Sequence, residues 1–228
     1  SKKYAKWGKM HIPTNWEVGG LQDFSGRVWF RKEFTLPKVR PGKKYAIQFN
    51  GIDYFATVWL NEHSLGYHEG YFQPFSFDVT KNLRKGKNTL VVKVDSPAEP
   101  LTSWPLRKRF IKGVFGHHDM RPGNWHPKKG QSRGTGGIWN TVQLVESDPI
   151  QITHIQVIPK LREKNRRAEL QIMASVESDV RGSALVEFVI REWKRGKGAG
   201  RKISQTKRTF LITRGQNSIH AKVTIRNP

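Results

Sequence analysis

The segment 49–97 reads FNGIDYFATVWLNEHSLGYHEGYFQPFSFDVTKNLRKGKNTLVVKVDSP. Apolar side chains alternate with small or polar ones along it, and Gly, Asn and Pro interrupt the alternation where turns are expected. This pattern predicts three hairpin-linked strands, each with one face toward a core. The segment therefore indicates an antiparallel β-sandwich.

Similar alternation extends to both sides of this segment. The strands expected in the first part of the chain are 28–36, 45–49, 56–60, 75–79, 89–95 and 139–146. Because a sustained helical period is lacking there, the predicted architecture is all-β, a jelly-roll sandwich. Trp16, Trp29 and Trp59 are expected in its core, since each lies within an apolar alternation. Asp53, Glu69 and Asp78 lie beside turns, where carboxylates commonly accept backbone or arginine hydrogen bonds.

The Asp148-Pro149 step marks a domain boundary. A residue before proline favours an extended conformation, and the aromatic content falls after this step. We expect a first domain at 1–148 and a second at 149–228. The strands expected in the second domain are 150–158, 168–175, 184–193, 208–213 and 217–225, spaced as in an immunoglobulin-like β-sandwich. Residues 221–228 read as a strand entering a turn, so this second sandwich is predicted to be truncated.

Charge is the unusual feature of the composition. The chain of 228 residues has 41 Lys and Arg against 18 Asp and Glu, a net charge of +23 that would attract nucleic acids or anionic surfaces. The basic runs 160–167 and 191–202 are expected to form solvated loops. They come without an RRM, KH or zinc-finger signature, so nucleic acid is not the expected partner.

Other functional classes are excluded by what the sequence lacks. It has no cysteine, which rules out disulfides, thiol chemistry and cysteine-ligated zinc. Its apolar runs stay well short of the roughly 18 residues of a membrane span, so no span is expected. The cellular compartment is left open by these features.

Several ordered motifs resemble the sugar-binding domain of glycoside hydrolase family 2, the family of β-galactosidases, β-glucuronidases and β-mannosidases. They are Val58-Trp59-Leu60-Asn61 and the runs 65–71, 75–80 and 86–90, preceded by similar runs at 12–16 and 24–34. The resemblance implies that an immunoglobulin-like domain follows the jelly roll and leads into a catalytic (β/α)8 barrel. Such a barrel takes about 250 residues of alternating strand and helix, a pattern that this sequence does not contain.

The resemblance therefore implies a non-catalytic N-terminal fragment of a longer enzyme. The parent would hydrolyse terminal β-linked sugars by the retaining mechanism, which uses two carboxyl groups about 5 Å apart. We expect the fragment alone to be inactive. Its expected partners are a carbohydrate, the missing barrel of the same parent chain and, at an oligomer interface, further copies of that chain.

The turn at Asn61-Glu62 offers one candidate for sugar contact. The resemblance implies that Asn61 reaches into the sugar pocket, as in the β-galactosidase branch of the family. An equally weighted interpretation makes Asn61 a turn residue that tolerates a left-handed backbone. Asn61-Glu62 mimics the Asn-Glu dipeptide that precedes the acid/base of such barrels, but its place at a hairpin tip favours Glu62 as a turn residue.

The acidic residue that the β-galactosidase branch places before its Gly-Ile-aromatic motif is missing before Gly137, which argues against β-galactosidase specificity.

The long connection 96–137 carries the other candidates. A forty-residue excursion between strands commonly lines a site or docks a domain, and its tryptophans could stack on sugar rings while Arg and His donate to hydroxyls or a uronate. The predicted substrate-binding residues there are Trp104, His117, His118, Asp119, Arg121, Trp125 and Arg133. The alternative is a loop that only covers one sheet face.

No metal or other cofactor is expected. His117, His118 and Asp119 with His126 have the donor types of a zinc site. Adjacent histidines in an extended segment point to opposite faces, however, which disfavours a shared metal.

Two other functions stay open at this point. The first is a stand-alone carbohydrate-binding module for an acidic glycan, favoured by the charge. The second, a basic nucleic-acid-binding β domain, rests on the charge alone.

Overall fold

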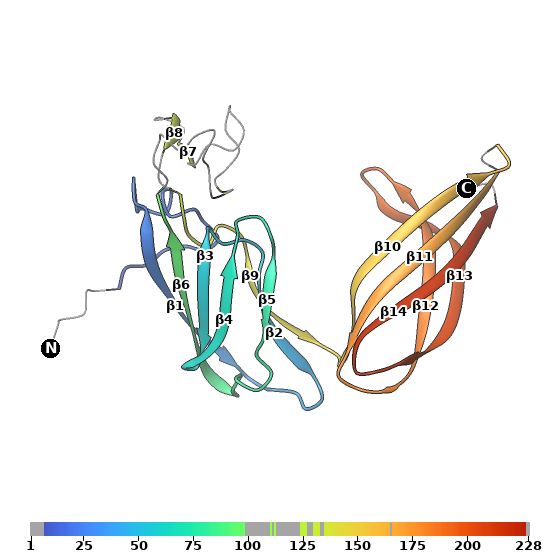
Figure 1. Ribbon diagram of the computed structural model, residues 1–228, viewed down its shortest axis with the longest axis horizontal. Helices are drawn as coiled ribbons and strands as arrows, with labels where there is room; N and C mark the ends of the chain where they lie inside the picture. Colours follow the sequence, from blue (N-terminus) through green and yellow to red (C-terminus); the bar gives the residue numbers. More distant parts are fainter. Residues whose placement is uncertain are drawn as a thin grey trace. The chain divides into compact units, whose positions relative to one another are not determined.

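A computed structural model describes residues 7–98, 110, 112, 135–164 and 166–226, together with the backbone of 124–126 and 130–132 (Figure 1). The described residues form strands and turns, in two compact units, Ser1–Glu146 and Ser147–Pro228. The predicted all-β fold with sandwich domains is confirmed. The described part of the chain includes no helix with the length and apolarity needed to cross a membrane.

The first unit contains two main sheets. One has the order β1-β6-β3-β4, formed by Gly26–Leu36, Gly86–Ser96, Phe55–Leu60 and His63–Glu69, and all its neighbouring strands are antiparallel. The other has the order β5-β2-β9, formed by Phe75–Asp78, Lys44–Phe49 and Val142–Ser147. A short two-stranded sheet, β7 (Asn124–His126) with β8 (Gly130–Ser132), belongs to the long connection.

The core of the first unit follows from the period of two along these strands. Ile47 and Phe49 of β2 and Val58 and Val92 of the larger sheet are at most 2% exposed and belong to one cluster. Fully burying each such side chain stabilises the fold by about 1.5–3 kcal/mol. The apolar residues whose alternation predicts the sandwich thus also stabilise it by their burial.

Of the three tryptophans predicted for the core, Trp16 is completely buried and Trp29 is not. Trp29 is 49% exposed, because Val28 and Phe30 on either side of it take the inward positions of β1. Its ring stacks on Trp59, which is half-buried, at 5.4 Å between ring centroids. The core prediction is therefore wrong for Trp29 and for Trp59, which lie together on the outer face of the sheet.

The second unit also has two sheets. One has the order β10-β11-β14, formed by Ile150–Arg162, Arg167–Ser178 and Gly215–Arg226, and the other pairs β12 (Gly182–Lys194) with β13 (Gly198–Ile212). The prediction of loops for the basic runs is right for the hairpin turns at 163–164, 166 and 195–197 and wrong for their flanks. The ladders continue up to these turns, through Arg162↔Arg167 and Lys194↔Gly198.

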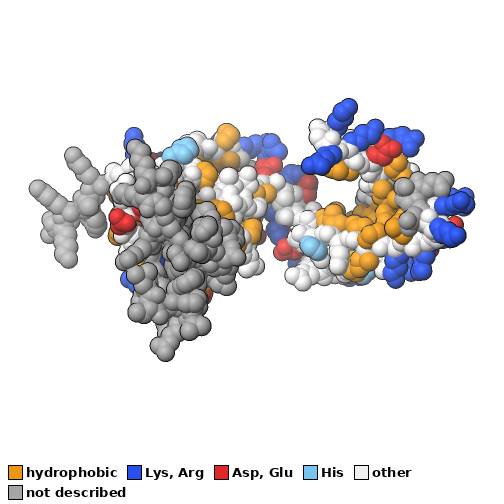
Figure 2. Space-filling view, turned by 90° about the horizontal axis from the view of Figure 1, so that it is seen from above, with side chains coloured by type: hydrophobic (Ala, Val, Ile, Leu, Met, Phe, Trp, Pro, Cys, Tyr) orange, Lys and Arg blue, Asp and Glu red, His pale blue; other side chains and the backbone are white. Residues whose placement is uncertain are grey.

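A groove of about 440 Å³ runs between the sheets of the second unit. It opens between β10 and β12, which are both edge strands of their sheets. Ile172 and Phe188 line its buried part, while Ile155 and Val157 at its rim are 58% and 49% exposed. Figure 2 shows apolar side chains gathered in the second unit with basic side chains around them.

The chain returns into the first unit at Gly136, where the absence of a side chain allows a close contact. Trp16 N donates to Gly136 O at 2.9 Å, and the indole of Trp16 packs directly on Gly136. A Cβ atom at Gly136 would lie 1.9 Å from Cζ2 of that indole. Only glycine fits there while Trp16 keeps its place.

We predict that Gly136→Ala destabilises the first unit by about 1–3 kcal/mol, because a buried indole must move to admit the methyl group. Urea unfolding followed by tryptophan fluorescence measures this change. Gly8→Ala is the matched control, since nothing lies within 4 Å of its Cβ position. Equal midpoints for the Gly136 variant and the unchanged chain would contradict the packing.

Candidate functional site

The candidate site is the corner of the first unit where the long connection leaves and returns. Strand β6 ends at Ser96, at the end of the sandwich near β7 and β8 (Figure 1). Asp53 lies just before β3, and Thr135 lies where the described chain resumes. Asp53 N donates to Gly137 O at 2.9 Å and Gly137 N to Asp53 O at 3.2 Å, which holds the returning chain beside Asp53.

The side chain of Asp53 is the centre of this corner. It is completely buried, and both its oxygens have hydroxyl partners: Ser96 Oγ lies 2.9 Å from Oδ1, and Thr135 Oγ1 donates to Oδ2. Ser96 Oγ is also 2.6 Å from Thr135 O. Ser96 has one hydroxyl proton and two acceptors in reach, the Asp53 carboxyl and the Thr135 carbonyl.

Lys112 brings the positive charge to this corner. Its buried Nζ donates to Ser96 Oγ at 2.9 Å and to Pro97 O at 2.6 Å. Burial raises the pKa of the Asp53 carboxyl, and the Lys112 charge and the two hydroxyl hydrogen bonds oppose that rise. Asp53, Ser96, Thr135 and Lys112 are called the Asp53 corner below.

Aromatic rings wall the Asp53 corner. Tyr71 is 3% exposed and stacks on Trp139 at 4.7 Å, and Trp139 Nε1 donates to Tyr71 O at 3.2 Å. The pKa of the Tyr71 hydroxyl is raised, first by burial and then by the charge of Asp53. Gly51 admits Trp139, because a Cβ atom there would lie 2.5 Å from the indole. On another side, Phe110 packs on Tyr54 at 4.9 Å.

This geometry suits support and recognition rather than bond cleavage. Retaining hydrolysis needs a second carboxyl group about 5 Å from the first. Among the residues that the structure describes, the hydrogen-bond partners of the Asp53 carboxyl are hydroxyl groups and its charged neighbour is a lysine. The corner therefore holds both ends of the connection 97–134 in place.

Asn61 lies at the other end of β3 from Asp53, in the β3–β4 turn. Its φ of 49° is left-handed, as the turn interpretation requires. Asn61 Nδ2 donates to Asn82 O and to Asn88 Oδ1, both at 2.8 Å, and Oδ1 accepts from Thr89 N at 2.9 Å. Both amide protons are thus used within the chain, and sugar contact by Asn61 stays a prediction.

The remaining predicted site residues are not tested by the structure. Trp104, His117, His118, Asp119, Arg121 and Arg133 lie outside the described residues, and Trp125 lies on β7, of which the backbone alone is described. The histidine and aspartate donors considered for a metal fall in the same part of the chain. Within the described part, His, Cys, Asp and Glu form no group of three or more that could hold a metal ion.

Sequence patterns predict an ordinary turn role for Asp53 and do not reveal the Asp53 corner. Its partners Ser96, Lys112 and Thr135 are 43 to 82 residues away, so spacing along the chain does not reveal them. One local signal was present: Asp53 is the only charged residue in the run 49–61 that leads into a buried strand. A carboxylate in such a place needs buried partners.

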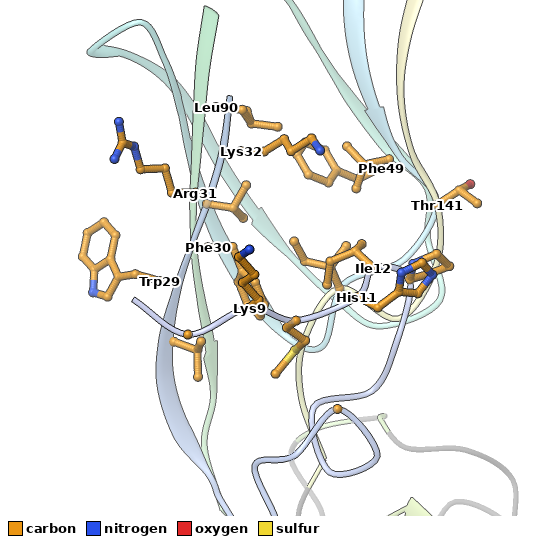
Figure 3. Close-up of a pocket in the computed structure, with 18 of the residues that line it drawn as sticks. Lys9, His11, Ile12, Trp29, Phe30, Arg31, Lys32, Phe49, Leu90 and Thr141 are labelled. Atoms are coloured by element: carbon orange, nitrogen blue, oxygen red, sulfur yellow. The ribbon is translucent and has the colours of Figure 1, made fainter. Parts of the chain in front are cut away.

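A larger cavity, of about 1170 Å³, lies elsewhere in the first unit (Figure 3). It opens beside β1 and the N-terminal segment, and core residues such as Phe30, Phe49 and Leu90 line it. Figure 3 shows Lys9 and His11 on the segment that crosses it, and Trp29 and Arg31 on the far side of β1. This cavity is an incompletely filled sandwich interior and has few convergent polar groups, so we assign it no ligand.

We predict that Asp53→Asn alters the pH dependence of stability. Because the pKa of Asp53 is raised in the folded chain, its stabilising effect is present below the ordinary carboxyl pKa of about 4 and is lost as pH rises toward the folded value. The variant should lose less stability than the unchanged chain as pH rises above that range. Urea unfolding at several pH values measures the difference, with Glu62→Gln in an exposed turn as control. Parallel pH profiles of the Asp53 variant and the unchanged chain would contradict the assignment.

Known proteins agree with this architecture. Residues 20–122 match the family described as the glycosyl hydrolase 2 galactose-binding domain-like family. A β-glucuronidase of Formosa agariphila is 36% identical over 136 residues, which cover 59% of this chain and 12% of that relative. A β-galactosidase of Bacteroides ovatus is 31% identical over 113 residues, covering 43% of this chain and 13% of the relative.

Solved structures extend the similarity to the fold of the whole chain. A β-glucuronidase from glycoside hydrolase family 2 superposes with a TM-score of 0.72 at 24% identity, covering 98% of this chain and 24% of that one. A β-D-mannosidase from Dictyoglomus thermophilum has a TM-score of 0.69 at 19% identity, covering 100% and 30%. The chain thus spans a small part of the proteins it matches. Residues 20–122 of the first unit are thus similar to the galactose-binding-like domain of glycoside hydrolase family 2, as the sequence motifs predicted.

Proposed function

We propose that this chain is the non-catalytic N-terminal part of a family 2 β-glycosidase that hydrolyses terminal β-linked glucuronides, galactosides or mannosides by the retaining mechanism. The observation that carries the proposal is the family match at 20–122 combined with fold neighbours that cover 98% of the chain and are themselves three to four times longer. The two carboxylates of the reaction would then belong to another domain of the parent.

The groove of the second unit supports the proposal that more of the parent packs here. Isolated soluble proteins rarely leave a wide apolar surface in water. Ile155 and Val157 of β10, which line the groove, are 58% and 49% exposed, and Val189 of β12 is 42% exposed. A strand of the parent chain added beside β12 would cover the groove and pair the free edge.

The Asp53 corner supports a role near the substrate. Its buried hydrogen bonds fix Ser96 and Thr135 at the two ends of the connection 97–134 and Lys112 within it, and most of the predicted sugar contacts lie in that connection. A connection that is held at both ends can present Trp and Arg side chains to the catalytic domain with little loss of conformational entropy on binding. We propose positioning of this connection as the role of Asp53.

The reading frame extended through the flanking genomic sequence tests the function. We predict that the longer protein hydrolyses a p-nitrophenyl β-glucuronide, β-galactoside or β-mannoside, whereas the 228-residue chain hydrolyses none of them. In the longer protein, Asp53→Asn should lower kcat/KM by about ten-fold or more through misplacement of the connection.

The control for this experiment is Glu62→Gln, at an exposed turn distant from the Asp53 corner. It should leave kcat/KM unchanged. A longer protein without a barrel, or one inactive on all three substrates, would contradict the proposal.

A further inference from the structure

The outer face of the sheet β1-β6-β3-β4 carries a second group of aromatic side chains. Phe110, which packs on Tyr54 beside the Asp53 corner, also contacts this group at Phe55, at 5.5 Å between ring centroids. The register places Trp29 beside Lys93, Lys93 beside Thr57 and Thr57 beside Tyr67. Directly paired residues of neighbouring strands point to the same face. These four side chains therefore form one row across the sheet, roughly 14 Å long at the usual strand spacing.

The ends of this row are aromatic pairs. Trp29 stacks on Trp59 at 5.4 Å with 26° between the ring planes, and Tyr67 stacks on Phe55 at 6.1 Å with 22°. Trp29 is 49% and Tyr67 58% exposed, so each keeps ring surface in contact with water. Stacked rings separated by polar residues are a surface on which the apolar faces of sugar rings can lie.

The charge at the centre of the row is the ammonium group of Lys93. Arg27 pairs with Asp95 at 2.6 Å, and Glu33 accepts from Arg31 and from Lys87. Lys93 forms no ion pair with any residue that the structure describes. Glu69 lies beside Phe55, at the margin of the row. An ammonium group between two aromatic pairs complements a carboxylate on a stacked ring.

We propose that this outer face binds a uronic-acid polysaccharide, with pyranose rings on the aromatic pairs and a carboxylate at Lys93. The site uses none of the four residues of the Asp53 corner and does not depend on the proposed hydrolase function. One free ammonium group suits a sugar with a single carboxylate. A nucleic acid strand instead needs a track of free cations for successive phosphates, and on this face the arginines are paired with carboxylates.

Binding of polygalacturonate to the 228-residue chain tests this proposal by calorimetry. Methyl-esterified polygalacturonate is the comparison ligand, because it has the same backbone without the charge. We predict that the unchanged chain prefers the unesterified polymer, that Trp29→Ala weakens binding by about ten-fold, and that Lys93→Gln abolishes the preference. The matched controls are Trp193→Ala, at a tryptophan 78% exposed on the second unit, and Lys38→Gln, at an exposed lysine of the first.

Each outcome supports or overturns polysaccharide binding at the outer face. Loss of binding in the Trp29 and Lys93 variants with both controls unchanged supports it, and so does unchanged binding by Asp53→Asn. Equal losses in the control variants would show binding by net charge and would overturn it. Absence of binding by the unchanged chain, or tighter binding of single-stranded DNA or a sulfated galactan to the same face, would overturn it as well. If Trp29→Ala does not fold, the change at the half-buried Lys93 still decides.

Discussion

The burial of one carboxyl group constrains the first unit more than any other contact. Asp53 is removed from water immediately before a core strand, and a buried carboxyl group is costly unless it is neutral or hydrogen-bonded. Ser96, Thr135 and Lys112 meet that requirement from three separate parts of the chain. The same backbone also pairs with Gly137. The end of β6, the start of β3 and the return of the long connection are thus fixed by one group.

Gly136 and Trp16 hold the returning chain in place next to the Asp53 corner. The indole occupies the space that any side chain at 136 would need, and backbone hydrogen bonds join the two residues. Tyr71 and Trp139 close the other side by stacking. The corner is therefore held by packing and hydrogen bonds together, so a forty-residue connection can leave the sandwich there without loosening its sheets. The outer face of β1-β6-β3-β4, with its aromatic pairs, remains free for a different task.

The fold could be predicted from the sequence because its signal is local. The alternation around Phe49, Val58 and Val92 indicates strands whichever strands pair with one another. The family motifs lie in the same runs of sequence. Alternation does not say which of two apolar neighbours faces the core, which is why Trp29 was misplaced. It also understated β13, since charged residues on a long solvent-facing strand resemble those of loops. The Asp53 corner depends on contacts between distant residues, which no local pattern encodes.

The protonation of Asp53 in the folded chain is the quantity that tests this account most directly. A titration of its side-chain carboxyl carbon by NMR, with the signal assigned through Asp53→Asn, measures it. The account predicts that Asp53 titrates above the ordinary carboxyl pKa of about 4, because burial outweighs the charge of Lys112. A carboxyl group that titrates at or below that value would show that Asp53 is solvated or fully ion-paired, and would contradict the central role assigned to its burial.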